Sequence, residues 1–533
     1  MKYLYSILAT IFVISLTLEY LSFYYKYSAI EVVNDMGIGY NLGNTYNYSD
    51  DLGNDSIENF EIKSWGTIFP TKKIINKIKK SGFKTIRFQV KYHSLLLNKN
   101  YTNEINIINS EWIIKIKEIV KWIINSNLYC ILSIYHDKNF WELEGRNAKD
   151  KYINLWSQIA NEFKDFNQHL IFESFYEFGF LCNLNYHEYY YNEELFISQI
   201  FVDIIRNSSM NNKERLLIVP GISSELELNN FIYDLYEIHI PKDPAKKLAI
   251  SLNYFFPAEN NFEFWDEYYD ITPIFLYDNL GIDYYFLPNF KWGRDKDYKN
   301  IMFYFSILRR VLLDKGFPVV IGEVGIYNKH SEKNSIRQFL YTIFSISSEN
   351  EGILPCLWNI SEKVEGDMKY YYNKETNEWN DKIIGENFLK ISKGNFIKNS
   401  KYYYKDNIET DDSNGYGYIH IDIGSKKVKK IILNVKIVDN YTSENDISVS
   451  ILTCYKDQDW YEIECIKGRR QYDGIFTYTI DVTNMECYYY VEETTWWGFE
   501  FVALNYLTII YEENYSFFDY KSFKSDVLKE ISK

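Results

Sequence analysis

Two glutamates of the chain stand in short apolar runs, where a carboxyl group could take part in catalysis. Glu177 closes the run "HLIFESFYE", and Glu323 lies near the end of "PVVIGEVG". A protonated carboxyl can donate a proton to a leaving oxygen while an ionised one attacks carbon or activates water, so a pair of carboxyls can carry out hydrolysis. Each glutamate alone could equally cap a helix, and it is their joint placement that favours a catalytic pair.

The elements that must position these residues are apolar runs that alternate with helix-period segments from Gly37 to about Lys393. Eight strand candidates can be counted: "GIGYNLGN", "KTIRFQV", "YCILSIYHD", "LIFESFYE", "RLLIVPG", "LAISLNYF", "PVVIGEVG" and "GILPCLWN". Helical segments between them include 71–81, 111–125, 152–166 and 301–315. The alternation predicts an α/β fold, a (β/α)8 TIM barrel. A doubly wound open sheet is the competing fold, but no Gly-rich phosphate turn follows the first run.

Polar residues gather at the carboxyl ends of these runs, which is the end where (β/α)8 barrels carry out their chemistry. Besides the two glutamates they are Asn41, Asn44, Arg87, His136, Asp137, Asn253, Trp358 and Asn359. Because the strand ends meet around one mouth, we expect these side chains to surround a single cleft. The sequence therefore predicts a site assembled from several strands.

The pattern changes after Gly394 to alternating runs such as "GYIHIDI", "KKIILNVKIV", "ISVSILTCY", "FTYTIDV" and "YLTIIYEE". Their period of two predicts a β-sandwich. The expected division is a signal peptide or membrane anchor at 1–29, a barrel domain at 30–393 and a β-sandwich accessory domain at 394–533, with carbohydrate as its candidate ligand.

The first residues have the layout of a secretory signal. Lys2 precedes an apolar run at 3–18 that carries no charge before Glu19. The alternative is an uncleaved anchor extended by residues 21–25. We therefore expect a secreted or extracellular protein, or else a membrane-anchored one that faces outside. Seven acceptor sequons, the first at Asn47, predict a glycoprotein in a eukaryotic host.

Composition narrows the class of partner. The formal charge of −15 argues against a nucleic-acid partner, since phosphate binding needs clustered Lys and Arg. Aromatic residues make up 19% of the chain, which suits sugar rings but also follows from an A+T-rich genome. Neither CxxC nor HExxH occurs, so we expect no metal and no cofactor. Of the six cysteines only Cys454 and Cys465, which flank a hairpin-like segment, are considered as a disulfide pair. We expect a monomer.

Six motifs in order carry a resemblance to a known family: "GYNLGNTY", "SGFKTIRFQVKYH", "LIFESFYE", the "WG" at Trp292, "FPVVIGEVG" and "YYYNKETNEW". They resemble glycoside hydrolase family five, within it the endo-β-1,4-glucanase (cellulase) branch, from about Gly37 to Lys393. The resemblance implies a polysaccharide substrate, a cellulose-type β-1,4-glucan. It also implies a retaining mechanism in which Glu177 is the acid/base and Glu323 the nucleophile.

The same resemblance implies roles for residues that bind the substrate or support the glutamates. Arg87 matches the arginine that lies near the nucleophile and keeps it ionised. Trp358 matches the tryptophan that floors the subsite of the sugar to be cleaved, and His136 lies in the histidine-containing motif of the third strand. Asn41, at the end of the first strand, completes the set.

Three positions depart from the family pattern. Tyr176 stands where the family has asparagine, and Asn253 and Phe255 stand where it has histidine and tyrosine. Two functions follow as alternatives. The first is an active β-glucanase with a rearranged subsite, in which Tyr176 or Asn253 takes over the missing hydrogen bonds. The second is a catalytically degenerate barrel retained as a glycan-binding or cell-wall-associated protein. A barrel with unrelated chemistry is a third reading.

Overall fold

The computed structural model describes residues 27–42, 70–91, 108, 110–135, 146–174, 187–225, 240–256, 292–293, 295–326, 331, 333–359, 371–374, 376–396, 400–404, 410–411, 418–424, 428–437, 447–456, 459–468, 474–481, 488–492 and 502–511. The chain divides into two compact units. The first comprises Met1–Phe262, Ile307–Ile326 and Ile346–Gly394, and the second comprises Glu263–Ser306, Tyr327–Ser345 and Asn395–Lys533.

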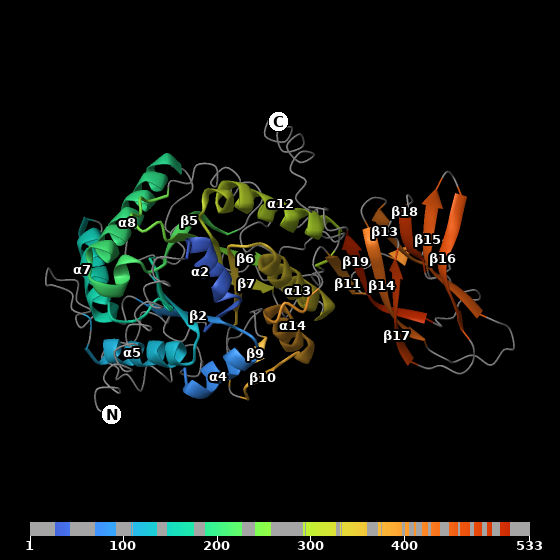
Figure 1. The fold of residues 1–533 in the computed structure, drawn as a ribbon, viewed down its shortest axis with the longest axis horizontal. Helices are drawn as coiled ribbons and strands as arrows, with labels where there is room; N and C mark the ends of the chain where they lie inside the picture. The colour runs from blue at the N-terminus through green and yellow to red at the C-terminus, as the bar shows by residue number, and fades with distance from the viewer. Residues whose placement is uncertain are drawn as a thin grey trace, which may run out of the picture. The chain divides into compact units, whose positions relative to one another are not determined.

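The first unit contains a closed barrel of eight parallel strands that follow one another in chain order (Figure 1). The strands are β1 (Gly39–Asn41), β2 (Thr85–Lys91), β3 (Tyr129–Tyr135), β4 (Leu170–Glu173), β5 (Leu217–Glu225), β6 (Leu248–Phe256), β7 (Val319–Ile326) and β8 (Ile353–Trp358). Strand β1 pairs with both β2 and β8, which closes the ring. The (β/α)8 prediction is confirmed, and the open sheet is excluded because it would have two edge strands.

Helices alternate with these strands along the chain. They are α4 (Lys72–Lys80), α5 (Ser110–Asn125), α7 (Arg146–Phe163), α8 (His187–Asn207), α12 (Asp295–Val311), α13 (Lys333–Glu349) and α14 (Lys382–Ser392), with the short 3-10 turns η3 (Met210–Lys213) and η5 (Leu313–Lys315). The sequence placed the third and fourth of its helical segments, 152–166 and 301–315, six residues too late. The missed turns of α7 and α12 begin with charged residues and carry no apolar period for a pattern to detect.

Helix α4 shows how local sequence sets these elements. Thr71 caps its first turn, where the Thr71 hydroxyl accepts a hydrogen bond from the Ile74 amide at 3.3 Å. Its apolar residues are spaced so that Ile74, Ile75 and Ile78 lie on one buried face. Lysines gather in its last turn, where positive charge interacts favourably with the helix dipole.

Helix α2 (Ala29–Met36) packs against the amino ends of the barrel strands. Ser28 and Glu31 form a capping box at its start, with reciprocal side-chain to backbone bonds of 3.3 and 2.7 Å. Its apolar side chains share one cluster with residues near the beginnings of the strands: Tyr129, Ile131, Ile171, Leu216, Ile218, Ala249, Val320, Leu354 and Cys356. The helix thus fills the amino end of the barrel, so the carboxyl end is the one left for a site.

The predicted signal or anchor segment lies, for all but its last three residues, outside the described ranges. Within those ranges, no helix combines the length and the apolar character needed to cross a membrane. The prediction for residues 1–29 therefore stays a prediction.

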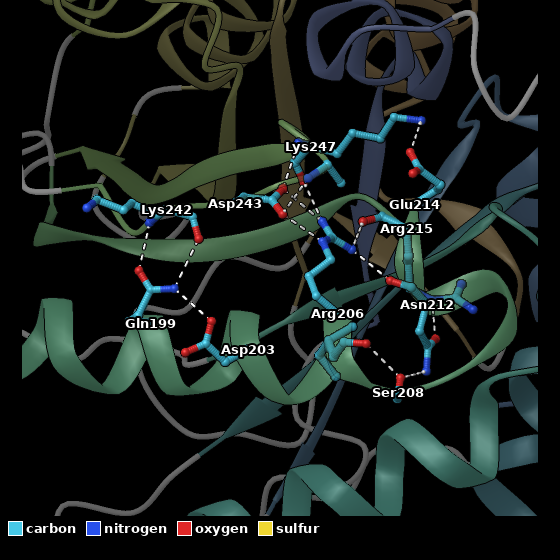
Figure 2. Close-up of polar contacts among 12 residues, drawn as sticks. Gln199, Asp203, Arg206, Ser208, Asn212, Glu214, Arg215, Lys242, Asp243 and Lys247 are labelled. Atoms are coloured by element: carbon cyan, nitrogen blue, oxygen red, sulfur yellow. Dashed lines mark hydrogen bonds and ion pairs between the residues drawn. The ribbon is translucent and has the colours of Figure 1, made fainter.

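A buried polar network links α8 to the loops that precede β5 and β6. Figure 2 shows Arg206 at its centre, with Nε and Nη2 donating to the two Asp243 carboxylate oxygens at 2.7 and 2.9 Å. Arg206 Nη1 also donates to the carbonyl oxygens of Asn212 and Arg215, at 2.7 and 2.9 Å. The side chains of the ion pair are only 6% and 2% exposed. This network ties a helix of the outer layer to the loops at the amino end of the barrel.

Asp243→Asn should lower the free energy of unfolding by about 2 kcal/mol at pH 7, because it removes a charge-assisted pair. Burial alone would raise the pKa of Asp243, but the Arg206 guanidinium and the backbone N–H groups of Lys247 and Ala245 hold it below the ordinary 3.8. In acid the unfolded chain therefore binds this proton first, and the native protein loses the stabilisation as the pH falls below about 4. Urea unfolding between pH 3 and 7 should show the difference between native and variant shrinking in acid.

The control for this change is Asp203→Asn, also drawn in Figure 2. Asp203 accepts one hydrogen bond at the surface, from Gln199 Nε2 at 3.0 Å. Its replacement should change stability by less than about 0.5 kcal/mol at every pH. Equal losses in the two variants would contradict the assigned role of the Arg206–Asp243 pair.

The second unit contains two antiparallel sheets from residue 400 onward (Figure 1). One has the order β11 (Ser400–Tyr404), β19 (Val502–Tyr511), β14 (Val428–Ile437) and β17 (Gly474–Asp481). The other has the order β12 (Thr410–Asp411), β13 (Tyr418–Gly424), β18 (Tyr488–Glu492), β15 (Ile447–Lys456) and β16 (Asp459–Gly468). The alternating runs do form strands, as predicted, while their arrangement as a sandwich stays a prediction.

The disulfide considered between Cys454 and Cys465 does not fit the register of β15 and β16. Cys454 pairs with Tyr461, and Cys465 pairs with Ser450. The two cysteines are therefore four positions apart along the hairpin, which is roughly 13 Å. A disulfide needs Cα atoms within about 7 Å. The hairpin is present as expected, but the pairing is wrong.

The "WG" motif forms a buried corner in the second unit. The Trp292 backbone N–H donates to Ser335 Oγ at 3.0 Å, and its ring packs against Tyr298 and Phe339 with centroid distances of 5.3 and 5.4 Å. Gly293 has a φ of 119°, and a Cβ there would lie 2.4 Å from the Gln338 amide. Both residues of the motif are thus required by packing.

Candidate active site

A buried arginine connects two glutamates inside the barrel. Arg87, on β2, is 1% exposed. Its Nε and Nη2 donate to Glu173 on β4 at 2.7 and 3.0 Å, and its Nη1 donates to Glu323 Oε1 on β7 at 3.1 Å. A fourth contact, from Nη2 to Ser133 Oγ on β3, measures 3.4 Å. One guanidinium therefore joins four strands, and both carboxylates it holds are about 1% exposed.

Glu323 also accepts a hydrogen bond from a glutamine. Gln89 Nε2 lies 2.8 Å from Glu323 Oε1, the same oxygen that Arg87 contacts. Gln89 follows Arg87 by two residues on β2, and alternate residues of a strand point to the same face. Both side chains therefore project into the barrel interior, and two donors from one strand converge on the glutamate.

The backbone of β7 is irregular where it presents Glu323. Its register shifts between Ile321 and Val324 against β8, and between Leu252 and Asn253 on β6. A bulge of this kind re-aims the side chain beside it. The preceding residue is Gly322, where a Cβ would lie only 3.2 Å from Arg87 Cζ. The glycine leaves the space that the guanidinium occupies beside the strand.

Three other predicted residues surround the same strand ends. Asn41 is fully buried, and its Nδ2 donates to the Gly322 carbonyl oxygen at 3.2 Å. Asn253 pairs in register with Glu323, and Trp358 pairs in register with Asn41. The structure therefore places Asn41, Arg87, Asn253, Glu323 and Trp358 around the carboxyl ends of the strands.

Of the other predicted residues, those that lie outside the described ranges are Asn44, His136, Asp137, Tyr176 and Glu177. His136 directly follows the last residue of β3, while Tyr176 and Glu177 come shortly after Glu173, which ends β4. The carboxyls of a retaining pair stand about 5 to 5.5 Å apart, and for Glu177 and Glu323 this separation stays a prediction.

Glu173 and Gln89 are functional candidates that the sequence analysis missed. Glu173 was read as part of an apolar strand run that leads to Glu177. A carboxylate inside a buried strand needs a partner of opposite charge, and Arg87 was the available one. Gln89 could have been found from its spacing of two from Arg87, which places both on one face.

A hairpin after β8 holds the strand ends in place. The Tyr371 hydroxyl accepts from the Ile326 amide and donates to the Ile326 carbonyl, both at 2.6 Å, at the last residue of β7. Asn359, just after β8, accepts from the Tyr371 and Tyr372 amides at 2.8 and 2.7 Å. Tyr372 begins β9 (Tyr372–Asn373), which pairs with β10 (Glu378–Trp379). Asn359, a polar strand-end residue of the sequence pattern, thus binds the hairpin backbone.

Two further groups near the strands are unusual in their protonation. Burial lowers the pKa of Lys374 to about 8, and its ammonium donates to the Leu42 carbonyl just after β1. Burial raises the pKa of the Cys356 thiol to about 12, with Arg87 opposing and both glutamates adding to the rise. Cys356 therefore stays a neutral thiol at pH 7. Among the described residues, no cluster of His, Cys, Asp and Glu has the arrangement of a metal site.

Residues 49–364 match the family model described as Cellulase (glycosyl hydrolase family 5). Endoglucanase A of Clostridium longisporum is 30% identical over 379 residues, which are 66% of this chain and 63% of that protein. The matched part thus spans less than two thirds of that relative.

Two solved structures are similar over the same part of the chain. A GH5-4 broad specificity endoglucanase from an uncultured bovine rumen ciliate has 34% identity and a TM-score of 0.59, covering 69% of this chain and 99% of that one. A glycoside hydrolase 5 lichenase variant from Caldicellulosiruptor sp. F32, solved with cellotetraose, has 25% identity and a TM-score of 0.55, covering 69% and 96%.

Proposed function

Because this chain belongs to glycosyl hydrolase family 5, the cellulase family, we propose that it hydrolyses β-1,4-linked glucan by a retaining mechanism with two glutamates. The observation that carries the proposal is the buried cluster in which Arg87 and Gln89 hold Glu323 at the bulge of β7. The names of similar proteins, an endoglucanase and a lichenase, support a β-glucan as the substrate class.

In the proposed first step, Glu323 attacks the anomeric carbon while Glu177 donates a proton to the leaving glycosidic oxygen. The C–O bond to the leaving sugar breaks, and an ester between Glu323 and the retained sugar forms. In the second step Glu177 removes a proton from water, which displaces Glu323 from the same carbon. Two inversions give net retention at that carbon.

The cluster supplies what this mechanism asks of a nucleophile. An arginine stays protonated at every pH that a protein tolerates, so Arg87 keeps a positive charge beside Glu323 and favours its ionised form. Glu173 takes the other edge of the guanidinium with two hydrogen bonds, which orients the planar group. Glu173 therefore orients one side of the Arg87 guanidinium, and the other side of the same group donates to Glu323.

The residues that depart from the family pattern bear on the two functions left open by the sequence. Asn253 lies in register with Glu323, where an amide can donate a hydrogen bond to a sugar or to a carboxylate. Phe255, two residues on, has no hydroxyl to offer. In an active enzyme Asn253 and Tyr176 form a rearranged subsite, whereas in a degenerate barrel the same cleft only binds glycan.

The wider proposal places this activity outside the cell. The apolar run at 3–18 is proposed as a secretory signal, with a membrane anchor facing outside as its alternative. Residues 394–533 are proposed as a β-sandwich accessory domain that binds carbohydrate, and the chain as a monomer. The composition of the chain, which is acidic and rich in aromatic residues, fits an enzyme that acts on glycans.

Release of reducing ends should be seen when the purified chain acts on barley β-glucan or carboxymethylcellulose, with xyloglucan and mannan as further substrates. Glu323→Ala provides the background, and circular dichroism establishes that both proteins are folded. A folded native chain that is inert on all four substrates, yet is retarded in gels containing β-glucan, would replace this proposal with the degenerate glycan-binding barrel.

A further inference from the structure

Gln89 is, beside Arg87, a second donor to Glu323 from β2. Its side chain is fully buried, and its Nε2 donates to Glu323 Oε1 at 2.8 Å. Its own carbonyl oxygen, Oε1, is buried and has no hydrogen-bond partner among the described residues. The amide is therefore satisfied on the side of the glutamate and unsatisfied on the other.

This arrangement fixes which end of the amide faces the carboxylate. An ionised carboxylate only accepts hydrogen bonds, so the NH₂ group must point toward Glu323 and the carbonyl away from it. A buried carbonyl without a partner costs stability, and leucine would fill the same volume without that cost. Burial alone thus does not explain a glutamine at position 89, whereas its hydrogen bond to Glu323 does explain it.

We propose that Gln89 is a positioning residue for the nucleophile: its amide fixes the orientation of the Glu323 carboxylate and stabilises its charged form. The inference rests on the proposed function, in which Glu323 attacks the sugar. Gln89 and Arg87 donate to one and the same oxygen, so they restrain rotation of the carboxylate from two directions. A donor that bonds the ionised carboxylate more strongly than the protonated carboxyl disfavours protonation.

The charged and titratable groups that face Glu323 in the described strands do not obscure the effect of Gln89 on the pH dependence of activity. Arg87 contacts it from β2 and remains charged throughout. Glu173, on β4, faces the other edge of that arginine, and Cys356, on β8, interacts with Glu323 as a neutral thiol. Glu177 is expected to set the alkaline limb of the activity profile, so the acidic limb reports on Glu323.

Gln89→Leu should lower kcat/KM on soluble β-glucan by about 10- to 100-fold, mostly through kcat. The acidic limb of its pH profile should move upward by about one pH unit, because the charged carboxylate has lost a donor. Gln89→Glu, which puts a second carboxyl in the place of the donor, should move the limb further in the same direction. The melting temperature of Gln89→Leu should change little, since the lost donor and the removed unsatisfied carbonyl have opposite effects on stability.

The matched control is Gln158→Leu. Gln158 is a partly buried glutamine on α7, where its side chain bonds Asn154 and the Ile108 amide, outside the Arg87 cluster. It should leave the pH profile unchanged. A merely structural Gln89 would lower the melting temperature without moving the acidic limb, and that result would overturn the proposal.

A readout that does not depend on the acid/base separates this inference from the proposed function. A 2-deoxy-2-fluoro cellobioside with a dinitrophenolate leaving group needs no proton donor. Glu323 attacks its anomeric carbon, the C–O bond breaks with its electrons on the phenolate, and the ester is counted by intact-protein mass. Labelling should be about 10-fold or more slower in Gln89→Leu than in the native chain or Gln158→Leu.

The outcomes are distinct. Native labelling at Glu323 without turnover of any polysaccharide would contradict the proposed function and leave the labelling comparison to decide the role of Gln89. Equal labelling rates in native and Gln89→Leu proteins would overturn the inference even if the chain is an active enzyme. A native chain that is neither active nor labelled would overturn both.

Discussion

Glu323→Ala should abolish hydrolysis of soluble β-glucan, lowering kcat by on the order of 10⁵-fold, as loss of a covalent nucleophile does in other hydrolases. The physical reason is that water, the only remaining attacker, would lack the alignment that Arg87 and Gln89 impose on the glutamate. Initial rates of reducing-end release, normalised to folded protein, measure the effect.

Azide distinguishes a nucleophile from a residue that only supports the site. In Glu323→Ala, azide should restore turnover of an aryl cellobioside and enter from the vacated face, giving the α-glycosyl azide. In Glu177→Ala, azide should instead attack the glycosyl-enzyme and give the β-glycosyl azide. Products of one configuration from both variants, identified by NMR, would contradict the double displacement.

Arg87→Leu should destabilise the barrel by about 3 to 5 kcal/mol. The change leaves Glu173 and Glu323 as two buried carboxylates without their shared counter-charge, each about 1% exposed. Urea unfolding at pH 7, followed by tryptophan fluorescence, measures the loss.

The control arginine is Arg309, which pairs with Asp314 at 3.7 Å with both side chains more than half exposed. Arg309→Leu should cost less than about 1 kcal/mol. The double variant Arg87→Leu, Glu173→Gln should regain part of the stability lost in Arg87→Leu, because one uncompensated charge is gone. If Arg87→Leu proves as stable as Arg309→Leu, the arginine does not carry the charge balance assigned to it.

The sequence predicted the barrel well because its signal is local. Each of the eight apolar runs overlaps one barrel strand, and a buried parallel strand needs nothing more than a short run of Ile, Val, Leu and Phe between turn residues. The ends of the strands were predicted less accurately. The predicted strand at 170–177 extends four residues beyond β4. An apolar sequence pattern does not show where neighbouring strands stop pairing.

The candidate site was predicted only in part because its contacts are long-range. Arg87 and Glu323 are 236 residues apart in the chain, and the resemblance alone placed them together. Phe255 lacks the hydroxyl of the tyrosine that the family carries at that position on β6. The structure instead shows a donor on β2, Gln89, which no pattern centred on β6 could reveal. The disulfide considered between Cys454 and Cys465 was wrong for a related reason, since the register of a hairpin depends on its turn.

The charge balance around Arg87 bears on how this site can change during evolution. Replacement of Arg87 by an apolar residue leaves two buried carboxylates without their counter-charge, so selection for a folded protein opposes it whether or not the protein cuts glycans. A lineage without hydrolysis would therefore lose this arginine slowly and only together with a change at one of its glutamates. In related sequences, retention of this arginine therefore indicates a stable barrel before it indicates an active enzyme.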